Sequence, residues 1–86
     1  METFPKLLLH QIALMRADIN TGHVLDDTYK IAVNDTQKVY TIFESVETAL
    51  NYARQILTEN KSIEVVIYNM NHELLYYLNS PPATQK

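Results

Sequence analysis

The sequence predicts an α+β fold in which a small antiparallel sheet of two hairpins carries an amphipathic helix on one face. Apolar residues recur at helical spacing over residues 46–57. One pair of segments rich in β-branched and aromatic residues precedes this helix, and another pair follows it. Each pair is separated by a short polar stretch that contains Asn. A further helix is expected at residues 4–17, so the predicted order of elements is α-β-β-α-β-β.

The chain is short enough to form a single domain, which we place at residues 1–79. Residues 80–86 (SPPATQK) are expected to form a flexible C-terminal tail, because two prolines and small polar residues cannot continue a strand. A chain of this size buries only about 60–65% of its unfolded surface, so association would add to a modest stability. The absence of Cys excludes disulfides and thiol chemistry.

Residues 4–17 fit two interpretations. Their apolar residues follow helical spacing, and Gly22 is well placed to end a helix. The alternative is a strand that enters a hairpin through residues 20–22 (NTG). Three consecutive leucines, residues 7–9, break the strict alternation of a strand, and the helix is therefore the prediction.

The first predicted hairpin joins strands at residues 29–33 and 38–43 through a turn at residues 34–37. The turn residues include Asn and Asp, which tolerate left-handed backbone geometry. The returning strand is rich in β-branched and aromatic residues. Residues 23–28 are predicted to be a polar connector.

The helix at residues 46–57 has the clearest signals in the chain. Ser45 is a good N-cap, and Glu44 and Glu47 place negative charge at the positive end of the helix dipole. Asn60 is expected to close the helix. Arg54 lies on the polar side, where a surface charge is expected.

The second predicted hairpin has strands at residues 63–68 and 73–78 around a turn at residues 69–72. Pairing Asn69 with His72 places Ile67 opposite Leu74. One face of this hairpin then carries Ile63, Val65, Ile67, Leu74, Tyr76 and Leu78. The other face carries Val66, Tyr68, Leu75 and Tyr77.

Both faces of the predicted sheet are therefore largely apolar, whereas an antiparallel sheet with one wet face alternates cleanly. The helix at residues 46–57 can cover only one of them. The second face needs either the N-terminal helix or a second subunit. The candidate interface residues on this second face are Tyr40, Ile42, Val66, Tyr68, Leu75 and Tyr77.

No catalytic, cofactor-binding or metal-binding site is predicted. The three histidines lack the spacing of a metal pair, and no nucleophile–base arrangement can be placed. The net charge of −3 and the scattered basic residues argue against nucleic acid and membrane surfaces as partners. Polar residues interrupt the apolar start of the chain, so no signal peptide is predicted and a cytoplasmic location is expected.

The stretch FESVETALNYARQIL resembles the helix of several small strand-helix-strand domains, antitoxin-like ones among them. The resemblance covers one helix and carries no diagnostic residue. We predict a non-enzymatic protein-interaction module that self-associates, as a homodimer, or binds another protein. One alternative is a small-ligand binding or enzymatic domain with a tyrosine-lined pocket between the sheet and the first helix. Another is an antitoxin-like regulatory partner.

Overall fold

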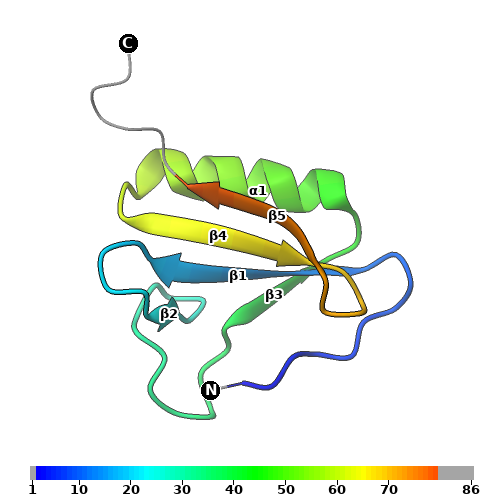
Figure 1. Ribbon diagram of the computed structural model, residues 1–86, viewed down its shortest axis with the longest axis horizontal. Coiled ribbons are helices and arrows are strands. Elements are labelled where there is room, and N and C mark those ends of the chain that lie inside the picture. The colour runs from blue at the N-terminus through cyan, green and yellow to red at the C-terminus, as the bar shows by residue number, and fades with distance from the viewer. Residues whose placement is uncertain (1, 80–86) are drawn as a thin grey trace.

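A five-stranded antiparallel sheet carries α1 on one face in the computed structural model, which describes residues 2–79 (Figure 1). The strands lie in the order β2-β1-β4-β5, and β3 also pairs with β1. Along the chain the elements are β1 (Ile12–Asp18), β2 (Val24–Leu25), β3 (Tyr40–Phe43), α1 (Val46–Glu59), β4 (Ile63–Tyr68) and β5 (Leu74–Asn79). The α+β class is confirmed, with the order β-β-β-α-β-β. The predicted tail, residues 80–86, lies outside the described residues.

β1 is the central strand of the sheet. Residues 13–18 pair with β4 along one edge, while β3 and β2 share the other edge. Leu14 and Ala13 point to opposite faces and are both fully buried. The small side chains of Ala13 and Ala17 allow other parts of the chain to approach the face away from α1.

α1 begins and ends where the sequence predicts. The Ser45 hydroxyl accepts a hydrogen bond from the Thr48 backbone N–H at 3.2 Å, and the Asn60 N–H donates to the Ile56 carbonyl at 2.8 Å. These bonds satisfy backbone groups that a helix end leaves unpaired. The helix buries Ala49, Ala53, Ile56 and Leu57 against the sheet residues Ile12, Leu14, Ile63, Val65 and Ile67.

The second hairpin is confirmed, but its predicted register is wrong by two residues. Ile67 lies opposite Tyr76, and a register shift between Ile67 and Tyr68 places Leu74 opposite Tyr68. The turn is longer than predicted, because His72 adopts left-handed geometry (φ 61°) and the Asn69 N–H bonds to the Glu73 carbonyl. Leu74 therefore belongs to the face away from α1, not to the helix-covered face where we predicted it.

The predicted N-terminal helix at residues 4–17 is wrong. Residues 12–18 form β1, and residues 19–23 turn the chain into β2, as in the alternative hairpin. The reason is that β1 is buried on both faces, so its apolar residues do not alternate with polar ones. Such a run cannot be distinguished from a buried helix by periodicity alone.

The first predicted hairpin is also wrong in its outer strand. Residues 29–33 form no strand, and Ile31 makes a single bridge to Leu25. The predicted connector instead contains β2, and β3 pairs with β1. The intervening loop folds around the carboxylate of Asp26, which accepts hydrogen bonds from Lys30 and Gln37. Contacts of this kind do not produce the alternating sequence pattern of a strand.

The assigned core predicts a large effect of Leu14→Ala. Leu14 is fully buried between α1 and the sheet. We expect the free energy of unfolding to fall by about 2–5 kcal/mol, as measured by urea denaturation. Leu9→Ala, at a position 87% exposed, is the control and should change it by less than about 0.5 kcal/mol. Equal midpoints for the two variants would show that the core is assigned wrongly.

Candidate interaction surface

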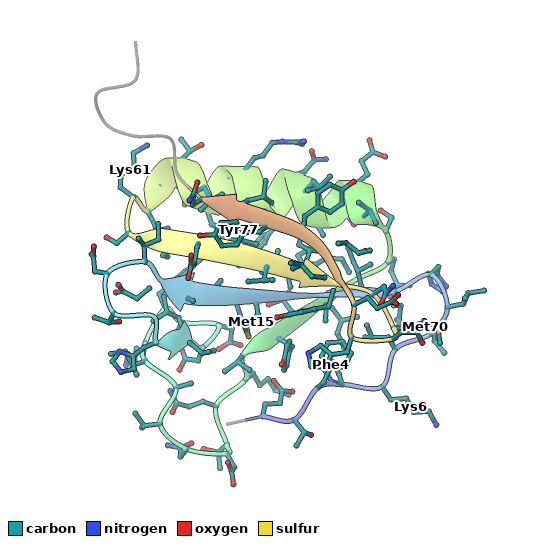
Figure 2. The ribbon with its side chains drawn as sticks, in the orientation of Figure 1. Phe4, Lys6, Met15, Lys61, Met70 and Tyr77 are labelled. Atoms are coloured by element: carbon teal, nitrogen blue, oxygen red, sulfur yellow. The ribbon has the colours of Figure 1, made fainter. Side chains whose placement is uncertain are left out.

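The face of the sheet opposite α1, here called the open face, holds five of the six predicted interface residues. Cross-strand pairing places them in two neighbouring rows. One row is Tyr40, Met15, Val66 and Tyr77, and the next is Ile42, Ala13, Tyr68 and Leu74. The sixth residue, Leu75, lies within the register shift of β5. Met15 on β1 and Tyr77 on β5 are labelled in Figure 2.

The N-terminal segment, residues 2–11, covers part of the open face. The Phe4 ring packs edge-on against Tyr40 and Tyr68, with centroids 5.3 and 5.8 Å apart, and stacks on His72 at 4.0 Å. Leu7 in the same segment is 5% exposed. The segment thus supplies part of the second layer that we predicted for a helix or a second subunit.

β5 remains the most exposed apolar element of the sheet. The exposed fractions of Leu74, Leu75, Tyr76 and Tyr77 are 58%, 40%, 42% and 54%. β5 stands at the end of the strand order and pairs only with β4 within the described chain. Its sequence, LLYYLN, contains no charged residue and no Pro, which are two of the devices that protect such an edge.

Two tyrosines of this surface, Tyr40 and Tyr77, have a raised pKa. The Tyr77 hydroxyl donates a hydrogen bond to the Glu64 carboxylate, which raises the pKa of Tyr77. Burial raises the pKa of Tyr40. A raised pKa favours the neutral phenol, which has an apolar ring and one polar end.

A hollow of about 320 Å³ lies between the C-terminal half of α1 and the end of β5. Its lining residues are Arg54, Leu57, Thr58, Lys61, Leu78 and Asn79. Arg54 donates to the side chain of Asn51 at 3.3 Å, and neither Arg54 nor Lys61 forms an ion pair with a described carboxylate. The hollow therefore combines an apolar floor with two cations that have no acidic partner within residues 2–79.

On the α1 side of the sheet, the Arg16 side chain is fully buried and joins three segments. Its guanidinium donates to the carbonyls of Asp26 and Val39, each at 3.3 Å, and to the hydroxyl of Thr41 at 2.9 Å. No described carboxylate forms an ion pair with it. Neutral acceptors that belong to the loop and to β3 therefore satisfy a buried cation.

The Asp26 carboxylate organises the loop beside Arg16. It accepts bonds from the Gln37 side chain at 2.7 Å, from the Lys30 N–H at 3.0 Å, and from the N–H and hydroxyl of Thr28. These bonds, first that of Gln37, hold the pKa of Asp26 well below its usual range. Tyr29 takes left-handed geometry in this loop (φ 68°), which a bulky residue adopts only when its surroundings impose it.

Residues 2–79 contain no cluster of three or more potential metal ligands. The histidines lie apart: His10 contacts Glu44 at 2.7 Å, His72 stacks on Phe4, and His23 lies between β1 and β2. The helix within the described part of the chain is not long and apolar enough to cross a membrane.

No family model, curated protein or solved structure matches the chain.

Sequence reasoning missed the Arg16–Asp26 centre and the hollow beside β5. An Arg within the apolar run IALMRA was the available signal for a buried, bonded cation. Arg54 was predicted to be an ordinary surface charge, because nothing in its own helix shows that Lys61 and the end of β5 lie beside it. The sequence did predict that Leu75 and Tyr77 of β5 belong to a second apolar face.

Arg16→Met should destabilise the protein. The substitution leaves the carbonyls of Asp26 and Val39 without their buried donor, and we expect a loss of about 3 kcal/mol in the free energy of unfolding. Arg16→Lys should also destabilise it, because one ammonium cannot span three segments. Arg54→Met, at an exposed position, is the matched control in urea denaturation. A stability of Arg16→Met equal to that of the control would contradict the role of this cluster.

Asp26 should contribute to acid sensitivity. Its pKa is lowered in the folded protein, so its stabilising contribution is complete above the unfolded pKa of about 3.9 and is lost as the pH falls below that value. Asp26→Asn should therefore lower stability at pH 7 and flatten its decline below about pH 4. Asp27→Asn is the control, because the Asp27 carboxylate accepts no hydrogen bond from the described residues, and this variant should keep the decline. Urea unfolding at a series of pH values measures both, and parallel curves for Asp26→Asn and the native chain would refute the expectation.

Proposed function

We propose that the protein is a non-enzymatic protein-interaction module that self-associates through β5 and the adjoining open face. The observation that carries this proposal is the exposure of Leu74, Leu75, Tyr76 and Tyr77 on an unprotected edge strand. Apolar side chains in this number and arrangement are typical of an association surface in a soluble domain.

Burial of this surface gives a favourable free energy of the size that association needs. Each fully buried Leu or aromatic side chain contributes roughly 1.5–3 kcal/mol. Association costs an estimated 4–15 kcal/mol in lost translational and rotational freedom, so several side chains must be buried together. β5 presents four of them on consecutive residues.

A second copy of the chain is the simplest occupant. An isologous interface brings the same patch of two subunits together, and an uncharged strand does so without repulsion between like charges. The chain is also small, and binding that favours the folded state adds to its stability.

The two alternatives from the sequence have less support. The tyrosine-lined pocket required a helix over the sheet, but Phe4 packs directly on Tyr40 and Tyr68 there. The antitoxin-like regulatory partner rested on the resemblance of one helix. The hollow at Arg54 and Lys61 is the feature that would favour a small anionic ligand.

Tyr77→Glu should weaken self-association while the fold is retained. The new carboxylate would be buried in the interface. It would also face Glu64, whose carboxylate accepts a hydrogen bond from the Tyr77 hydroxyl in the native chain. We expect at least a tenfold increase in the dimer dissociation constant by sedimentation equilibrium, with an unchanged circular dichroism spectrum.

Leu75→Glu tests the same surface without the contact to Glu64. Leu9→Glu, at an exposed leucine away from β5, is the matched control and should associate like the native chain. A native chain that stays monomeric at micromolar concentration, or equal association of all these variants, would refute the proposal.

A further inference from the structure

The outer backbone edge of β5 faces no other strand within residues 2–79. The N–H and C=O groups of such an edge can form a ladder with another extended chain. β5 runs from Leu74 to Asn79, with its register shift near its beginning. The edge is therefore able to accept a partner strand over this length.

Charged side chains of opposite sign, which belong to neighbouring elements, lie near the two ends of β5. The end at Asn79 borders the hollow that contains Arg54 and Lys61. The other end follows Glu73, whose exposed carboxylate accepts a bond from the Asn69 side chain at 2.8 Å and forms no ion pair with a described cation. In Figure 2, Lys61 and the turn residue Met70 lie at opposite ends of the β4–β5 hairpin.

Two identical strands that pair antiparallel are related by a two-fold axis. The beginning of one strand then lies beside the end of the other, at a strand spacing of about 4.8 Å. For β5 this arrangement brings Glu73 of each copy next to the hollow of the other.

We propose that two copies of the chain pair edge to edge and antiparallel through β5, with Glu73 of each copy beside Arg54 and Lys61 of the other. This inference rests on the proposed self-association and specifies its geometry. The partner strand fills the hollow against Leu57 and Leu78, and the two sheets become one continuous sheet with both helices on the same face.

The pattern of charge favours a second copy over an unrelated peptide. Any extended peptide can satisfy the backbone edge, but this chain also supplies an uncharged strand and an acid at the required end. Because of the two-fold axis, each charge match occurs twice. An acidic peptide would match the cations once and would leave Glu73 without a cation.

Reversal of the charges tests this geometry. Lys61→Glu and Glu73→Lys should each raise the dimer dissociation constant about tenfold, because each removes two symmetry-related attractions and creates two repulsions. The double variant Lys61→Glu/Glu73→Lys should return to within about threefold of the native value. Lys38→Glu makes the same change in net charge as Lys61→Glu at an exposed position in the loop before β3, and it should have no such effect. The differences should shrink in 0.5 M salt, where charges are strongly screened.

Nitroxide distances test the pairing of the strands independently. The native chain has no Cys, so Leu74→Cys, Tyr76→Cys and Asn79→Cys each give a single label site. In an antiparallel pair the distance between identical labels should be shortest near residue 76. It should grow by about 7 Å for each residue away from the axis, which is twice the rise per residue.

The outcomes separate this inference from the proposed function. A monomeric native chain overturns both. A native dimer whose charge variants associate alike, and whose label distances have no minimum within β5, overturns the strand pairing and leaves self-association standing. Rescue in the double variant together with the distance minimum establishes the pairing.

Discussion

The contact on which the rest of the fold depends is the buried guanidinium of Arg16. A cation removed from water is costly unless each of its nitrogens finds an acceptor. Arg16 meets this condition through two carbonyls and a hydroxyl supplied by the loop and by β3. The planar guanidinium has five donors and can reach all three acceptors at once, which an ammonium cannot. The result is that residues 26–39, although they lack regular structure, are tied to the centre of the sheet.

This anchorage makes the two edges of the sheet unequal. On one side of β1, the strands β2 and β3 share a single edge, and the loop fixed by Arg16 and Asp26 joins them. On the other side the sheet runs through β4 and ends at β5, which has no comparable cover within the described residues. The exposed surface of β5 therefore follows from how the chain distributes its segments between the two edges of the sheet. The polar, hydrogen-bonded loop lies at the first edge, and the apolar strand β5 forms the second edge.

The sequence was sufficient to predict the elements whose signals are local, and insufficient to predict those that depend on contacts between distant residues. α1 and β4 were predicted at or near their observed bounds because capping residues, helical spacing and alternation act over a few residues. The register of the second hairpin was wrong by two residues, but a shift of two preserves the face of each side chain. For that reason Val66, Tyr68 and Tyr77 still fall on the open face, and Leu74 at the bulge is the residue that changed sides. The prediction for β1 was wrong because both faces of this strand are buried. The prediction for the loop was wrong because Gln37 and Asp26, which are hydrogen-bonded, lie eleven positions apart in the sequence.

The N-terminal segment explains how one small chain can carry two apolar faces. Phe4 packs on Tyr40 and Tyr68, so part of the open face is covered within a single chain. The segment does not hide Leu74, Leu75 or Tyr77. In the proposed dimer, edge pairing would place Leu75 of each copy close to Tyr77 of the other. The surface left by the N-terminal segment is thus continuous with the unpaired edge, and a single two-fold contact can bury both.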